Sequence, residues 1–113
     1  MNQLNQIILE GNVVNDVEIK TLPNGTSVCT VPLAVNRTYK QSDGSTLDEV
    51  SYFDVRAFEN LAAACVNYCK TGRVLRVVGR LKQDRWTDSE GKKHSKVFIA
   101  AEHIEFKPMD GGN

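Results

Sequence analysis

Apolar and polar residues alternate along most of this chain, a pattern typical of half-buried strands rather than helices. The longest alternating stretch covers residues 27–39 and has an apolar residue at every odd position from Cys29 to Val35. Similar stretches cover residues 6–14, 49–58, 73–85 and 95–106, with a shorter one at 17–20. The pattern therefore predicts five main strands.

Glycine and proline mark the breaks between these strands and two irregular points within them. Gly11 predicts a bend that lets the first strand serve two sides of a small barrel. Pro32 lacks an amide donor, so we expect its strand to be an edge or to bulge at this point. Turns or loops are predicted at residues 22–25, 40–46 and 88–91.

Residues 60–70 form the one stretch with convincing helical spacing. Its apolar residues at that spacing are Leu61, Cys65 and Tyr68. Asn60 is the expected N-cap, and Gly72 is the expected C′ residue after the last turn. The chain thus reads as three strands, one helix and two strands.

This order fits the OB-fold, an all-β five-stranded Greek-key barrel, with its one helix between strands 3 and 4. An immunoglobulin-like sandwich has about seven strands and no such helix, so it fits less well. The length, 113 residues, suits one domain with one core. We assign residues 1–107 to an OB-fold domain and expect residues 108–113 to be a disordered end.

The single tryptophan, Trp86, stands at the end of the stretch 73–85. Arg85 precedes it, and Lys92 and Lys93 follow the next turn. A flat aromatic side chain with positive charge on both sides suits single-stranded nucleic acid, which has π faces and a charged backbone. The alternative is a hairpin whose tryptophan covers a neighbouring core. A second candidate surface lies in the stretch 49–58, where Tyr52 and Phe58 bracket Arg56 on one strand face.

The formal net charge is zero, but the charges are segregated along the chain. Residues 70–96 contain nine Lys or Arg against three Asp or Glu, whereas residues 1–69 contain four against eight. Residues 97–113 contain one against three. A chain of this kind carries a cationic stripe despite its neutral total, which is compatible with a nucleic-acid partner.

Other classes of function have little support in the sequence. The three cysteines contain no CxxC pair and are expected to be buried thiols rather than zinc ligands or disulfides. His94 and His103 are expected to be structural, so we predict no metal site and no cofactor. The acidic residues are scattered, which argues against a nuclease-type enzyme. No signal peptide or membrane span is evident, so a cytoplasmic, nucleoid-associated location is expected.

The chain resembles the bacterial single-stranded DNA-binding protein (SSB) family. The resemblance rests on the order and spacing of short segments, and it covers residues 5 to about 106. The segments are NQIILEGN at 5–12, LPNG at 22–25, FENLA at 58–62, KTG at 70–72, VGRL at 78–81 and RWTDSEG at 85–91. It implies an OB-fold subunit that wraps and protects single-stranded DNA without sequence specificity during replication, recombination and repair.

The resemblance also implies site residues. Aromatic stacking positions carry over to Tyr39, Tyr52, Phe58 and Trp86. Basic contacts to the DNA backbone carry over best to Lys82 and Arg85, and the local pattern adds Arg37, Lys40, Arg56, Arg73, Arg76 and Arg80. This chain departs from better-known members at Asp54 and Asp84, which are acidic where those members carry Arg, and this weakens the expected phosphate contacts.

The family usually forms homotetramers, so the resemblance implies self-association, with a dimer as the smaller alternative. The apolar run at residues 4–9 is expected to pair with its twin across a two-fold axis. Its candidate interface residues are Leu4, Gln6 and Ile8, together with Phe53 from the stretch 49–58, which stands where a subunit-contact His is common.

Family members usually end in a flexible linker and an acidic tip that recruits replication and repair proteins. We expect residues 108–113 to carry no acidic tail, so such partners are expected only if a longer form of the protein has one. An OB-fold accessory protein of primosome type, acting mainly through partners, remains the alternative function.

Overall fold

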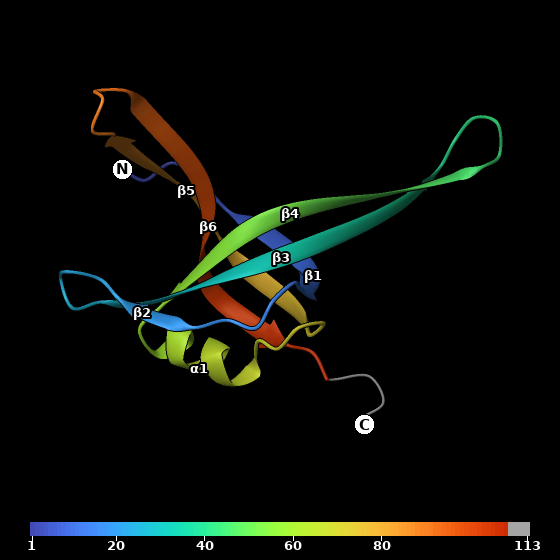
Figure 1. Cartoon of the computed structure of the whole chain (residues 1–113). Coiled ribbons are helices and arrows are strands. Elements are labelled where there is room, and N and C mark those ends of the chain that lie inside the picture. Colours follow the sequence, from blue (N-terminus) through green and yellow to red (C-terminus); the bar gives the residue numbers. More distant parts are fainter. Residues whose placement is uncertain (109–113) are drawn as a thin grey trace.

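The computed structural model describes residues 1–108, and the predicted disordered end falls outside it from residue 109 on. It contains six strands and one helix (Figure 1). The strands are β1 (Ile7–Val13), β2 (Ile19–Thr21), β3 (Ser27–Lys40), β4 (Thr46–Phe58), β5 (Val74–Thr87) and β6 (Lys93–Phe106), and the helix is α1 (Asn60–Tyr68). The predicted order of elements is confirmed, and the short run at 17–20 corresponds to β2.

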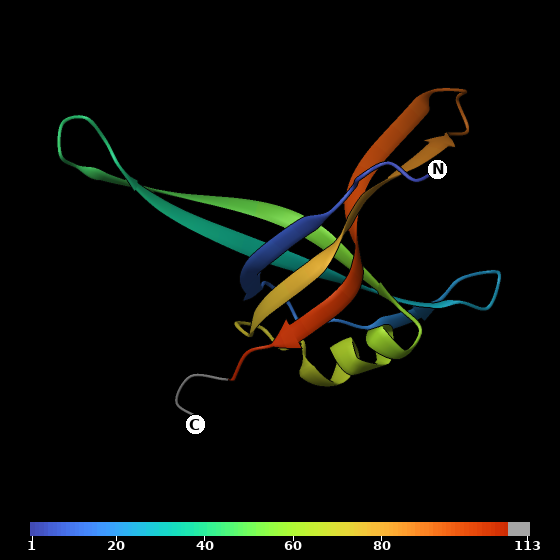
Figure 2. The ribbon, with the colours of Figure 1, turned by 180° about the vertical axis from the view of Figure 1, so that it is seen from behind.

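The strands close into a barrel through pairings between distant parts of the chain. The sheet order is β1-β5-β6-β4-β3-β2, and β1 also pairs with β3, so five strands form the closed barrel and β2 extends one edge. The β4–β6 contact is parallel and all the others are antiparallel. Figure 2 shows β1 lying along β5, as the register from Ile7↔Gly79 onwards requires.

Two long hairpins project beyond the barrel in different directions (Figure 1). We call residues 36–53 the β3–β4 arm and residues 80–97 the β5–β6 arm, because nearly all of their residues are exposed or only partly buried. Helix α1 lies between β4 and β5 in the chain and covers one end of the barrel, far from both arm tips. The arms leave a large surface that the core does not use.

The core is built from the alternating positions that the sequence predicted, but it ends earlier along the strands. Leu33, Val55 and Leu75 are fully buried. Leu81 and Val97 continue the sequence alternation of the buried residues Val77 and Ile99, yet 45% and 55% of their surfaces are exposed, because the arms have left the barrel at these positions. The alternation of apolar and polar residues therefore predicts which strand face is buried, but it does not predict at which residue each strand leaves the barrel.

The helix termini differ from the sequence-based expectation. Asn60 is the first helical residue rather than the N-cap, and Glu59 precedes it with φ 56° and no side-chain cap hydrogen bond. Instead, the Glu59 backbone N–H donates a hydrogen bond to the Ser27 carbonyl of β3. This tertiary contact fixes the start of the helix, a role that an N-cap side chain has in an isolated helix. The helix ends at Tyr68, and Gly72 takes its φ of +89° in the later turn rather than at C′.

Two glycines allow backbones to approach more closely than any side chain permits. A Cβ at Gly11 would lie 2.5 Å from the Ala34 carbonyl oxygen, where β1 passes from β5 to β3. A Cβ at Gly79 would lie 2.2 Å from the Ala100 carbonyl oxygen, beside a register shift in the β5–β6 ladder. The barrel turns its corners at these two points, in agreement with the bend expected at Gly11.

Pro32 lies where the outer edge of β3 changes partners. The β2 pairing ends at Cys29, and the β1 pairing begins at Leu33. The Pro32 carbonyl still accepts a hydrogen bond from Val14 at 3.0 Å. The missing amide donor therefore falls in a gap between two ladders, where no partner strand requires it.

The three cysteines are fully buried and free, as expected. Cys65 and Cys69 lie on one side of the α1 segment and pack in the same core cluster as Cys29 of β3. Burial raises the pKa of the Cys29 thiol to about 11. Within residues 1–108, no helix is long and apolar enough to span a bilayer.

We expect Gly79→Ala to destabilise the protein by at least about 2 kcal/mol, because the new methyl group collides with backbone that cannot rotate away. Urea denaturation followed by circular dichroism measures this change. Ser95→Ala, an exposed change in the same ladder, should stay within about 0.5 kcal/mol of the parent. Equal stability of the two variants would show that the close approach imposes no constraint.

Candidate nucleic-acid interface

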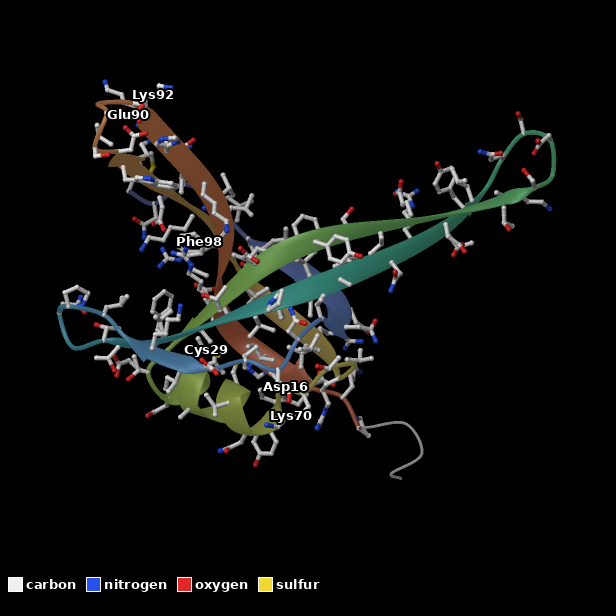
Figure 3. All side chains as sticks on the ribbon, viewed as in Figure 1. Asp16, Cys29, Lys70, Glu90, Lys92 and Phe98 are labelled. Carbon is white, nitrogen blue, oxygen red and sulfur yellow. The ribbon has the colours of Figure 1, made fainter. Side chains whose placement is uncertain are left out.

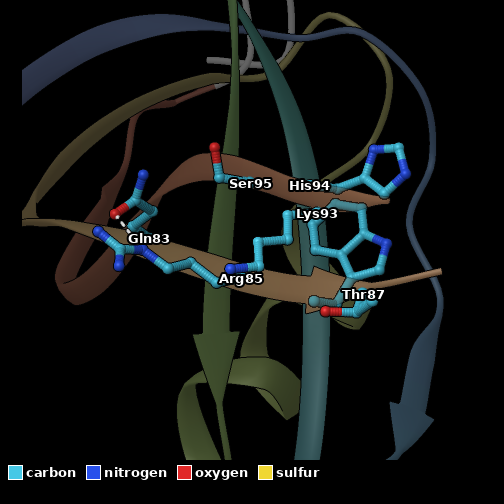
Figure 4. Close-up of a pocket in the computed structure, with 7 residues that line it drawn as sticks. Gln83, Arg85, Thr87, Lys93, His94 and Ser95 are labelled. Carbon is cyan, nitrogen blue, oxygen red and sulfur yellow. Dashed lines mark hydrogen bonds between the residues drawn. The ribbon is translucent and has the colours of Figure 1, made fainter. Parts of the chain in front are cut away.

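Trp86 lies near the tip of the β5–β6 arm and is 49% exposed. It faces His94 across the ladder, with ring centroids 5.5 Å apart and ring planes inclined by 19°. A shallow hollow of about 400 Å³ adjoins the pair (Figure 4). Its lining residues are Gln83, Arg85, Trp86, Thr87, Lys93, His94 and Ser95. The indole thus lies outside the hydrophobic core of the described chain, which favours the binding interpretation over the packing alternative.

Strand register places Trp86 on one continuous surface with residues of both neighbouring strands. Residues that lie opposite each other in a ladder share a face, and Trp86, Asp84 and Lys82 lie opposite His94, Lys96 and Phe98. The parallel contact Arg56↔Ala100 continues this face onto β4. We call it the aromatic face; its members are Tyr52, Asp54, Arg56, Phe58, Lys82, Asp84, Trp86, His94, Lys96 and Phe98.

The aromatic face offers stacking surfaces at its two ends. Tyr52 is 67% exposed on β4, and Trp86 is half exposed on β5. Between the arms lies a cleft of about 330 Å³, lined in part by Tyr52, Phe53, Leu81 and Val97. Phe58 is partly buried near the barrel. Bases could therefore stack at separated points along one path.

Arg56 joins the two halves of this face. Its guanidinium lies 3.9 Å from the centre of the Phe98 ring and 2.6 Å from the Asp84 carboxylate. Phe98, at the base of the arm, is only 3% exposed (Figure 3). Phe98 therefore takes part in a partly buried cation–π contact and offers no free aromatic surface.

Both acidic departures from the family pattern lie within the aromatic face as ion-pair partners. Asp84 pairs with Arg56, and Asp54 pairs with Lys96 at 2.6 Å. Each carboxylate neutralises a cation that would otherwise face solvent. Within residues 1–108, Lys82 and Arg85 form no ion pair, so each carries uncompensated positive charge, Arg85 beside Trp86 and Lys82 opposite Phe98.

Several predicted site residues lie off the aromatic face. Tyr39 and Arg37 share the opposite side of the β3–β4 arm, where the Arg37 guanidinium is 5.7 Å from the Tyr39 ring centre. Lys40, the last residue of β3, returns to the parity of Tyr52. Arg85 alternates with Trp86 and bonds to Gln83 at 3.1 Å. Tyr39, Arg37 and Arg85 therefore point away from the aromatic face, whereas Lys40 lies on the same side as the face, at the end of β3.

Arg73, Arg76 and Arg80 are not brought to Trp86. Arg73 donates to the Lys107 carbonyl at 2.6 Å near the helix end of the barrel. Arg76 lies between two carboxylates, 3.5 Å from Glu10 and 3.8 Å from Glu105. Arg80 lines a separate hollow beside the N-terminal segment. The sequence pattern grouped these arginines with Trp86 because they belong to the same predicted strand, but they lie farther back along that strand than Trp86.

The sequence-based reading missed His94 and Lys96, and it left Phe98 without a role at the site. The turn at residues 88–92 would have identified His94 from the sequence. A hairpin centred on Glu90 pairs positions whose numbers sum to 180, so Trp86 must face His94. The contact of Lys96 with Asp54 depends on the approach of β4 to β6, which no local pattern reveals.

The predicted subunit-contact residues are exposed in the single chain. Leu4 is 93% exposed, Ile8 is 65% exposed, Phe53 is 38% exposed, and Gln6 is also exposed. Among the described residues, β1 pairs with β5 along one edge and meets β3 only at Asn12 and Val13. The other edge of the first half of β1 is therefore open to a further strand.

A family model described as the Single-strand binding protein family matches residues 4–107. The chain belongs to this family. The family consists of binding proteins rather than enzymes, so the expectation of a non-enzymatic protein is confirmed. Both the resemblance seen in the sequence segments and the class of function that it implied are thus confirmed.

Relatives match nearly all of this chain but only part of their own length. A "Single-stranded DNA-binding protein" of Wolinella succinogenes is 38% identical over 109 residues, which cover 96% of this chain and 67% of that protein. The protein of the same name from Aquifex aeolicus is 40% identical over 101 residues, covering 89% and 68%. That of Helicobacter hepaticus is 38% identical over 101 residues, covering 89% and 59%. The chain spans 59–68% of the length of these relatives.

Solved structures share the fold. A deletion mutant of the single-stranded DNA binding protein from Thermus aquaticus superposes with a TM-score of 0.82 at 26% identity, covering 96% of this chain and 52% of that one. A Plasmodium falciparum SSB, solved in complex with ssDNA, superposes with a TM-score of 0.83 at 22% identity, covering 96% and 98%. These similarities confirm the OB-fold barrel predicted from the order of elements.

Proposed function

We propose that this protein binds and protects single-stranded DNA, without sequence specificity, during replication, recombination and repair. The observation that carries the proposal is the aromatic face, which joins the exposed rings of Tyr52 and Trp86 to flanking cations on a family-typical OB barrel. The curated relatives named above carry single-stranded DNA binding in their names. The cellular setting that fits this role is the cytoplasm, at the nucleoid.

Base stacking supplies the selective part of the binding energy. Stacking on an aromatic side chain is worth about 1–3 kcal/mol per base and accepts any base, since every base has a π face. Trp86 and Tyr52 are the principal stacking residues, Phe58 extends the path, and Tyr39 is a separate stacking position on the opposite side of the β3–β4 arm. Duplex DNA hides its base faces, so this contribution discriminates against it.

Phosphate contacts supply the second part. Arg85 adjoins Trp86 on β5, Lys82 lies on the aromatic face opposite Phe98, and Arg37 and Lys40 extend positive charge along the other arm. Each phosphate neutralised on a single strand lowers the slope of log K against log salt by about 0.7. Because Asp54 and Asp84 already neutralise two cations of the face, we expect a shallower slope than its count of Lys and Arg suggests.

Assembly completes the proposal. We infer that the open edge of β1 pairs with a second copy, burying Leu4, Gln6 and Ile8, and that Phe53 contributes to further contacts in a homotetramer or a dimer. Replication and repair proteins are proposed as partners of any longer form that carries an acidic tail. The domain at residues 1–107 supplies the DNA-binding and self-association functions.

Replacing the indole tests the stacking role. Trp86→Ala should weaken oligo-dT binding by about tenfold or more, which corresponds to the energy of one stacked base. Fluorescence anisotropy of a labelled oligo-dT measures the affinity, with duplex of equal length as competitor. Tyr68→Ala is the matched control, since Tyr68 is 51% exposed on the helix, away from the aromatic face. A Trp86→Ala variant that binds as well as the parent would remove Trp86 from the site.

Removing the Asp84 carboxylate from Arg56 tests whether this ion pair limits phosphate binding. Asp84→Asn should raise the affinity for oligo-dT several-fold and steepen the salt slope by about 0.7, because one more cation becomes available to phosphate. Glu105→Gln is the control: it removes the same charge at the other end of β5 and frees Lys107, while Arg76 keeps its contact with Glu10. If the two variants gain equally, net charge alone explains the effect.

Light scattering tests the assembly. At micromolar concentration the parent should have a mass two or four times the chain mass of 12.6 kDa. Ile8→Lys should shift the population towards monomer, because a charge would enter the buried contact. Ile19→Lys, at an exposed position on β2, should leave the mass unchanged. A monomeric parent would contradict the proposed contact.

A further inference from the structure

His94 is the least explained member of the aromatic face. Its ring stacks on the Trp86 indole, and its Nε2 lies 2.8 Å from the Asp88 Oδ2. The His94 side chain is 42% exposed and that of Asp88 is 32% exposed, so solvent and ligands reach both. The imidazole thus touches the proposed stacking residue on one side and a carboxylate on another.

The turn of the β5–β6 arm fixes the carboxylate. Asp88 Oδ1 accepts the amide N–H groups of Glu90 and Lys92, each at 2.9 Å, and the Asp88 backbone closes the turn by bonding to Lys92 and Gly91. Its second oxygen, Oδ2, is left for His94. The hydrogen bond from His94, with those of the Lys92 and Glu90 amides, lowers the pKa of Asp88 from its ordinary value. The carboxylate therefore stays charged at neutral pH.

The charge of the His94–Asp88 pair depends on one proton. With a protonated imidazole the pair is neutral, and with a neutral imidazole it carries one negative charge beside the indole. The other charged groups around it are Arg85, Glu90, Lys92 and Lys93, and groups of these types keep their charge between about pH 6 and pH 8. An imidazole is the side chain that titrates in this range.

We propose that His94 is both a positioning residue and a proton-dependent binding residue of the Trp86 subsite, so that single-stranded DNA binds more tightly when His94 is protonated. The inference rests on the proposed function and deepens it. The imidazole covers one side of the indole and, anchored by Asp88, holds the ring for a base on its exposed side. In its protonated form it cancels the carboxylate charge that would repel the phosphate of the stacked nucleotide.

The sign of the pH effect follows from these contacts. Affinity is higher with a protonated His94 imidazole and lower with a neutral one. Since the favoured complex holds this proton, binding and proton uptake are linked. The expected change is about two- to fivefold between about pH 6 and pH 8, the size of an exposed charge contact.

The chain provides its own matched control, because it has only two histidines. Affinity for oligo-dT, whose thymines do not titrate in this range, is measured by anisotropy at about pH 6 and pH 8 for the parent, His94→Gln and His103→Gln. Glutamine keeps a donor for Asp88 but never gains the charge. His103 is exposed on β6 opposite Val78, away from the arm. Trp86 fluorescence of the free protein is titrated over the same range, since a protonated imidazole quenches a stacked indole.

The inference is supported if affinity falls with pH in the parent and in His103→Gln but not in His94→Gln, and if the fluorescence transition is lost only in His94→Gln. It is overturned, while single-strand binding stands, if His94→Gln keeps the full pH dependence of the parent or if the parent shows none. Failure of the parent to bind oligo-dT at either pH overturns the proposed function itself and the inference with it.

Discussion

The relative geometry of the two arms depends on the contacts of Arg56 with Phe98 and Asp84. The barrel halves meet at β4 and β6 through a parallel contact of only two residue pairs. Arg56 reinforces this short seam by packing on Phe98 and pairing with Asp84, and the Lys96–Asp54 pair adds a second bridge. Together with β1, which pairs with both β5 and β3, these side chains fix the relative direction of the two long hairpins.

The same bridges determine how the surface uses its charge. Cations that hold the arms together are less available to a polyanion, so the aromatic face is electrostatically near balance rather than strongly basic. In the proposed function, stacking on exposed rings therefore carries more of the recognition than phosphate contact does. The pairing of His94 with Asp88 repeats this arrangement at the arm tip, but with a cation whose charge depends on pH.

The fold was largely predictable, because alternation at residues such as Val31, Leu33 and Val55 records the barrel interior directly. Local patterns failed where tertiary contacts take over. Leu81 and Val97 keep the core parity after the barrel has ended, and Glu59, not Asn60, precedes the helix because it bonds to β3. Trp86 was found from its neighbours in sequence, whereas the ion pairs of Asp54 and Asp84 join residues about 30 to 40 positions apart.

The register of β1 also bears on how the chain folds during synthesis. Ile7 pairs with Gly79, so the main partner of the first strand is made only after about two thirds of the chain has left the ribosome. Until then the nascent chain holds an apolar strand with an unfilled edge, since its contact with β3 covers only Asn12 and Val13. Loop closure over such a separation is slow compared with hairpin formation. The β3–β4 arm can therefore form cotranslationally as a local hairpin, while barrel closure waits for β5 and the β5–β6 arm waits for β6.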